Sequence, residues 1–180
     1  MGEIETVSGE ISIIRKENEV EDQVAAILRH VNGGISIHHQ TRMTHKPLNE
    51  YYLIDGTKAS LEIEFGPAWS FVSFESFRMH LYERGNRVTD VTRYNDFDID
   101  AEVSRSGRYK KELEHFCDCI LNDKTPLVTG EDGRKAIEAI NAVYLSSQTG
   151  QKIRLPLKES PDLETLFRRM PNRGVEADPE

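Results

Sequence analysis

The chain of 180 residues has no long apolar run, one tryptophan and two cysteines. A membrane-spanning helix needs about 20 consecutive apolar residues, and the longest apolar stretches here are only a few residues long. No charged segment followed by an apolar segment and a small-residue cleavage site opens the sequence. We therefore expect no membrane partner and a cytoplasmic location.

Positive charge is also scarce. The 23 lysines and arginines are outnumbered by 31 aspartates and glutamates, which gives a formal net charge of -8, and the basic residues are scattered. Because nucleic-acid binding draws most of its affinity from basic side chains that neutralise phosphates, we expect no nucleic-acid partner.

The two cysteines, Cys117 and Cys119, are only two positions apart within a helical pattern. Residues at that spacing point in different directions on a helix, so a disulfide between them is not expected. No second cysteine pair is present to complete a zinc site. The sequence therefore predicts two thiols that are buried or half-buried.

Short alternations of apolar and polar residues fill the sequence from Gly2 to about Val91, and this period is typical of β-strands. One hairpin is predicted where 24–31 is followed by Asn32-Gly33-Gly34 and then by Ile35 and Ile37. A second is predicted from 52–54 through Asp55-Gly56-Thr57 to the alternating segment 60–65. Further strands are predicted around 69–74, 78–83 and 87–91.

The pattern changes after a polar, aspartate-rich stretch, 93–106, which we interpret as a loop. From Arg108 the apolar residues recur at helical spacing up to Leu121. A second helix is predicted between Thr129, a suitable cap, and Gly150, which can adopt the left-handed conformation that ends a helix. A short strand is expected at 152–157. The apolar stripes predicted for the two helices are Leu113, Phe116, Cys117, Ile120 and Leu121 in the first, and Ala136, Ile137, Ile140, Val143 and Tyr144 in the second.

Strands followed by helices predict an α+β fold, a mostly antiparallel open β-sheet with two amphipathic helices packed on one face. The other face is left without a cover. In such a fold that face is either polar or meets another subunit or domain, so it is available for oligomerisation.

Several motifs that carry chemistry are missing. No G-x-G-x-x-G follows a predicted strand, no phosphate-binding P-loop is present, and the βαβ alternation of a dinucleotide fold does not occur. The serine-hydrolase elbow and the H-E-x-x-H zinc helix are absent too. The sequence therefore predicts no cofactor site, no metal site and no catalytic residue of these kinds.

The densest group of reactive side chains lies between His38 and Lys46. His38 and Arg42 share one face of a predicted strand and His39 lies on the other, so the adjacent histidines are poorly placed to bind one metal. Pro47 is expected to end the strand, which leaves 43–46 as a loop able to hydrogen-bond a polyhydroxylated ligand. The alternative is an ordinary solvated strand end. A third possibility, a metal site built on His38, His45 and His80, has no supporting spacing.

Several segments in order resemble one known family. They are 25–34, 51–61, 109–116, the run from Pro126 to Ala136, and 146–155. Together they make the chain similar to the carboxy-terminal domain of the Gfo/Idh/MocA family, which includes glucose-fructose oxidoreductase and inositol dehydrogenase. The resemblance extends over about residues 4 to 157, so we expect one such domain at 1–157 and a polar tail at 158–180.

The resemblance implies a function. Enzymes of this family join a dinucleotide-binding Rossmann domain to such a sheet domain, and act with NAD or NADP on a hydroxyl of a sugar, cyclitol or related small molecule. The open sheet face commonly builds the oligomer. By resemblance, the substrate-binding candidates here are Arg42, Thr44, His45 and Lys46. The family's lysine-proline motif and its aspartate/histidine catalytic helix have no counterpart in this sequence, which implies that catalysis needs a Rossmann domain in cis or in trans.

Two hypotheses follow. The first is a substrate-binding and oligomerisation domain of an NAD(P)-dependent oxidoreductase that is inactive alone and forms a homo-oligomer through the open sheet face. The second is a stand-alone binding or scaffold subunit that uses the open sheet face to hold a partner protein.

Overall fold

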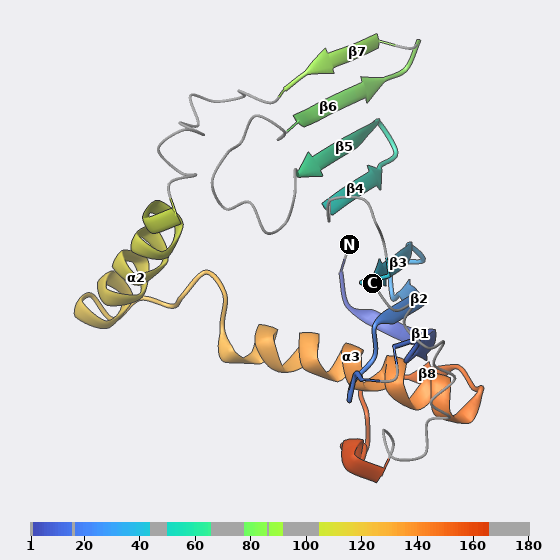
Figure 1. Cartoon of the computed structure of the whole chain (residues 1–180). Helices are drawn as coiled ribbons and strands as arrows, with labels where there is room; N and C mark the ends of the chain where they lie inside the picture. The colour runs from blue at the N-terminus through green and yellow to red at the C-terminus, as the bar shows by residue number, and fades with distance from the viewer. Residues whose placement is uncertain are drawn as a thin grey trace, which may run out of the picture. The chain divides into compact units, whose positions relative to one another are not determined.

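The computed structural model describes residues 2–15, 17–43, 50–65, 78–85, 87–91 and 105–165. Figure 1 shows their helices and strands. The chain divides into two compact units, of which the first comprises Met1–Met43 and Leu127–Glu180 and the second comprises Thr44–Pro126. Each unit contains a four-stranded sheet.

The sheet of the first unit is formed by β1 (Ile4–Ser12), β2 (Gln23–His30), β3 (Ile35–Thr41) and β8 (Ile153–Arg154). Its strand order is β3-β2-β1-β8, and each neighbouring pair is antiparallel. The turn between β2 and β3 contains Gly33 at a φ of 88°, a conformation that residues with a Cβ rarely adopt. This hairpin confirms the one predicted at Asn32-Gly33-Gly34.

Helix α3 (Gly130–Thr149) lies across β1 and β8, as Figure 1 shows. Thr129 caps it: the Asp132 N–H donates to the Thr129 hydroxyl, and the Thr129 N–H donates to the Asp132 carboxylate. At the other end Gly150 has a φ of 66°, and its N–H donates to the carbonyl of Ser146. Both predicted helix ends are therefore confirmed.

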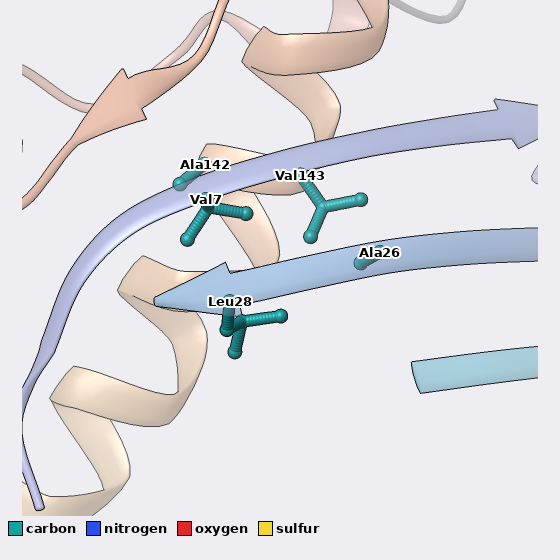
Figure 2. Close-up of a cluster of buried hydrophobic side chains, with 5 residues drawn as sticks. All are labelled: Val7, Ala26, Leu28, Ala142 and Val143. Carbon is teal, nitrogen blue, oxygen red and sulfur yellow. The ribbon is translucent and has the colours of Figure 1, made fainter. Parts of the chain in front are cut away.

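The buried core of the first unit lies between this helix and the sheet (Figure 2). From Ala26 to His30 every second residue of β2 is buried, and Ala26 and Leu28 face the helix (Figure 2). Ile27 lies on the opposite side of the strand. The side chains that form the cluster are Val7, Ala26, Leu28, Ala142 and Val143. Burying a valine or leucine side chain stabilises a fold by about 1.5–3 kcal/mol, so this small cluster makes a large contribution.

The helix approaches β1 closely because position 9 is a glycine. A Cβ on Gly9 would lie 2.8 Å from a methyl carbon of Val143. The Gly9 N–H donates to the Ser146 hydroxyl over 3.0 Å, and the Ile11 N–H donates to the Ser147 hydroxyl over 3.2 Å. Since β8 pairs only with Thr6 and Val7, the two serines satisfy backbone donors that the short strand does not reach.

The second unit contains β4 (Glu50–Asp55), β5 (Ala59–Phe65), β6 (Arg78–Glu83) and β7 (Arg87–Asp90), paired in sequence order as an antiparallel meander. The pairing register places apolar and polar residues on opposite faces. One face carries Tyr52, Ile54, Leu61, Ile63, Met79 and Leu81. The other carries Tyr51, Leu53, Glu62, Glu64, His80 and Tyr82.

Helix α2 (Arg105–Leu121) belongs to the same unit. Its apolar stripe is present as predicted, but Leu113, Phe116 and Ile120 are all more than half exposed. Lys110 and Glu114 form an ion pair at 3.6 Å along its surface. Cys119 is buried and Cys117 is exposed, and both are free. The prediction that both thiols are at least half-buried is therefore wrong for Cys117, because the apolar stripe on which it lies is itself exposed.

The predicted fold class, α+β with mostly antiparallel strands, is confirmed. The structure adds that the strands form two sheets, and that the strand expected at 152–157 spans only two residues. The hairpin with its turn at Asp55-Gly56-Thr57 and the strands predicted at 78–83 and 87–91 are confirmed as β4 to β7. The predicted strand at 69–74, most of the loop at 93–106 and much of the tail at 158–180 lie outside the described residues.

Candidate functional site

The candidate substrate loop begins where β3 ends. Arg42, the first of the four predicted site residues, follows the strand directly and is exposed. Its backbone N–H donates to the carbonyl oxygen of Asp22 over 2.8 Å, and the next N–H, of Met43, donates to the Thr41 hydroxyl over 3.0 Å. The start of the loop is therefore attached to the sheet by its backbone. Thr44, His45 and Lys46 lie outside the described residues.

Asp22 organises this end of the sheet from a buried position, with 3% of its surface exposed. Its carboxylate accepts hydrogen bonds from the N–H groups of Ile14 and Arg15 and from the side-chain amide of Asn18. Burial raises the pKa of Asp22, but these hydrogen bonds outweigh burial and hold the pKa below its ordinary value. Asp22 thus anchors Ile14, Arg15 and Asn18 through its charged carboxylate, and the start of the candidate loop through its backbone carbonyl.

Next to Asp22 in sequence, Glu21 reaches α3. The Tyr144 hydroxyl donates to Oε1 of Glu21 over 2.8 Å. Burial and this hydrogen bond raise the pKa of Tyr144 to about 12, so its proton stays on the phenol at physiological pH. Oε2 of Glu21 is buried and has no hydrogen-bond partner within the described part of the chain. The pair joins the loop before β2 to the helix.

Neither Glu21 nor Asp22 was a site residue predicted from the sequence, and Tyr144 was predicted only as part of an apolar stripe. The acidic pair stands directly before a strand, and an aspartate there is well suited to accept backbone hydrogen bonds from a turn. That signal was available in the sequence. Which backbone groups Asp22 would bind was not, because the donors lie in the connection between β1 and β2.

The histidines do not gather into a site within the described ranges. His38 and His39 are exposed and pair across the ladder with Ala26 and Ala25, so they lie on opposite faces as predicted. No group of three histidine, cysteine, aspartate or glutamate side chains is arranged to hold a metal ion among the residues that the structure describes. His45, one member of the suggested metal site, is not among them.

A dinucleotide cofactor does not fit the elements seen here. Such a cofactor binds at a glycine-rich turn between a parallel strand and a helix, whereas every strand pair in the described ranges is antiparallel. We therefore derive no step through a cofactor on these residues. Among the described residues, no helix is long and apolar enough to cross a membrane.

Comparison with known proteins identifies the domain type. Residues 1–155 match the family model described as "Oxidoreductase family, C-terminal alpha/beta domain" of the Gfo/Idh/MocA group. The chain is 29% identical over 108 residues to D-xylose 1-dehydrogenase [NADP(+)] of Haloarcula marismortui, an alignment that covers 60% of this chain and 26% of the relative.

Solved structures show the same fold. Aldose-aldose oxidoreductase from Caulobacter crescentus, complexed with glycerol, matches with a TM-score of 0.66 at 24% identity, over 86% of this chain and 42% of that one. A dehydrogenase from Bordetella pertussis in complex with NADH and UDP-GlcNAcA matches with a TM-score of 0.62 at 19% identity, over 88% and 41%. The chain thus spans less than half the length of the relatives it matches. Because the family model covers most of the chain, the chain belongs to the Gfo/Idh/MocA family as its C-terminal domain.

Proposed function

We propose that this C-terminal domain of a Gfo/Idh/MocA oxidoreductase supplies one wall of a substrate pocket and an assembly surface, for an NAD(P)-dependent reaction at a hydroxyl of a sugar, cyclitol or related small molecule. The observation that carries the proposal is the family match over residues 1–155. The chain covers only about two fifths of the matched structures. The proposal therefore assigns cofactor binding and catalysis to a Rossmann domain, in cis or in trans.

The substrate contacts are proposed for Arg42, Thr44, His45 and Lys46. Their side chains offer the donors that recognise hydroxyl groups, and Arg42 follows the end of β3, where Asp22 holds its backbone. A rigid attachment at one end suits a binding loop, because less conformational entropy is lost when the loop closes on a ligand.

A calorimetric titration of the purified chain with NADH and then with NADPH tests this division of labour. We expect no binding of either nucleotide. Binding with a dissociation constant on the order of micromolar would contradict the proposal, because this chain would then hold a cofactor site of its own.

The assembly surface is proposed to be the face of the first unit's sheet that α3 does not cover. On that face Ile27 and Ile37 pair directly across β2 and β3, and Ile35 lies in the adjacent row. All three are more than half exposed, and Ile37 reaches 78%. Clustered exposed isoleucines favour burial against another subunit. We propose that this subunit is a second copy of the chain, in a cytoplasmic homo-oligomer.

Light scattering tests the assembly. We expect a dimer or a larger species that Ile37→Glu converts to monomer, because a buried charge in an apolar contact is costly. The matched control is Ile54→Glu, which places the same charge on the other sheet and should leave the assembly unchanged. A strict monomer at high concentration would contradict this part of the proposal.

A further inference from the structure

A cluster of side chains on the polar face of the β4–β7 sheet has no role in the function proposed above. It consists of Tyr51, Leu53, Glu62, His80 and Tyr82, and Glu62 lies at its centre. Leu53 and His80 stand directly across the ladder from Glu62, one on each neighbouring strand. The two tyrosines lie one row away on opposite diagonals, which is within reach of long side chains.

Hydrogen bonds hold the central carboxylate in place. The Tyr51 hydroxyl donates to Oε1 of Glu62 over 3.1 Å, and the Tyr82 hydroxyl donates to Oε2 over 2.5 Å. The ring nitrogen Nδ1 of His80 lies 3.7 Å from the same Oε2. The two phenol hydrogen bonds lower the pKa of Glu62, with His80 adding to the effect, so the carboxylate is charged at neutral pH.

This cluster is open to solvent. Tyr51 is 57% exposed, Leu53 52% and Tyr82 37%. Because both phenol protons are directed to Glu62, the tyrosine rings are held beside the carboxylate while much of their surface remains accessible. Each carboxylate oxygen accepts one phenol hydrogen bond and keeps a further lone pair for another donor.

The charge around the cluster is mostly negative. Within the described residues, Glu62 forms an ion pair with His80 at 3.7 Å. Glu64, Asp55 and Asp90 lie on the same face in the same or neighbouring rows, and Arg78 is opposite Glu64. A second copy that presented the same face would bring these carboxylates together, so the charge favours a cationic occupant over self-association.

A guanidinium group satisfies all of these features at once. It is planar and permanently charged, it stacks on aromatic rings, and its paired N–H groups match a carboxylate. A lysine ammonium would pair with Glu62 but lacks the flat surface that lies well against tyrosine rings. We propose that the Glu62 cluster is a binding site for an arginine side chain presented by a partner protein.

An NMR titration of the full chain with a capped Gly-Arg-Gly peptide tests the site. We expect saturable amide shifts confined to the three strands around residues 51–53, 62 and 80–82. The matched probe is the capped peptide with citrulline in place of arginine, which keeps the shape and loses the charge, and it should produce no such shifts. Equal shifts with both peptides, or no shifts with either, would overturn the proposal.

Three variants locate the site. Glu62→Gln should weaken arginine-peptide binding about fivefold, since it removes the negative charge of a solvent-exposed pair. Glu64→Gln makes the same change in the next row and should weaken binding less than about twofold. Tyr51→Ala removes an exposed ring on the edge strand and should weaken binding about threefold, in line with an exposed cation–π contact.

The result that contradicts the site is equal weakening by Glu62→Gln and Glu64→Gln, because binding would then follow the overall negative charge and not the cluster. Should Glu62→Gln disturb the sheet, its amide spectrum would show widespread changes before any peptide is added. The comparison of Tyr51→Ala with wild type then decides: unchanged affinity in that variant would overturn the proposal.

Discussion

The two sheets show the same alternation of side chains along their strands but differ in what covers them. In the first unit α3 buries one face, and β2 alternates between buried residues such as Leu28 and exposed ones such as Ile27. In the second unit every residue of β4 is exposed, on the apolar face and the polar face alike. The same two-residue period therefore produces a core in one unit and an accessible polar cluster in the other.

Strand alternation separates the two faces of a sheet, whereas the packing of a helix decides which face is stabilised by burial. It also predicts where substitutions matter. In the first unit they should cost stability through lost packing and buried hydrogen bonds, and in the second they should mostly change binding. The stability of each variant below can be measured by urea unfolding followed by far-UV circular dichroism.

The largest effect is expected from Leu28→Ala. It removes a nearly buried side chain from the cluster in Figure 2, and such changes cost about 2–5 kcal/mol in free energy of unfolding. Leu53→Ala is the same substitution on a strand of the second unit where the side chain is 52% exposed, and it should cost less than about 1 kcal/mol. Similar losses in free energy of unfolding in both variants would contradict this difference between the two sheets.

Asp22→Asn should come next, with a loss of about 2–3 kcal/mol, because the charged acceptor of several buried hydrogen bonds becomes neutral. The same change at Asp118, a more exposed aspartate paired with Lys124, should lower the free energy of unfolding far less, because solvent screens an exposed ion pair.

Asp22 also predicts a pH dependence. Its pKa is lower in the folded protein than in the unfolded chain, so its contribution is fully present above the unfolded value of about 4 and is lost as the pH falls through the folded value. Unfolding measured at several pH values between neutral and strongly acid should show that wild type loses more stability than Asp22→Asn. Parallel curves would show that Asp22 is not the anchor that we describe.

The capping box of α3 should contribute about 1 kcal/mol to the free energy of unfolding, and Thr129→Ala should remove that contribution. Thr125→Ala, four residues earlier and outside the helix, is the matched control and should change stability by less than about 0.5 kcal/mol. An equal effect at both positions would mean that the cap does not stabilise the helix.

The smallest effects are expected at two glycines of α3, where substitution by alanine should change the free energy of unfolding in opposite directions. Gly150→Ala places a Cβ at a φ of 66° and should cost about 1 kcal/mol. Gly133→Ala lies inside the helix with no atom within 4 Å of the added Cβ, and should stabilise the protein by about 0.5–1 kcal/mol. Two changes of the same sign would contradict this account of the helix end.

Much of the fold could be predicted from local signals. The hairpin at Asn32-Gly33-Gly34 and the helix from Thr129 to Gly150 depend on turn and cap residues that act within a few positions of themselves, and the structure confirms both. The candidate loop stays a prediction: the structure describes Arg42, and Thr44, His45 and Lys46 lie outside the described residues. Its anchor, Asp22, was missed because its hydrogen-bond donors belong to a different part of the chain.

By itself the sequence determined the elements: the period of each strand and helix, the residues that begin and end them, and the absence of a dinucleotide motif. Those properties are local, since they arise from neighbours a few residues apart. Only the tertiary structure decided that Gly9 lets α3 approach β1, that Asp22 holds Arg42, and that two tyrosines meet at Glu62. These contacts join residues from different elements, and their energies depend on a register and a packing that no local pattern specifies.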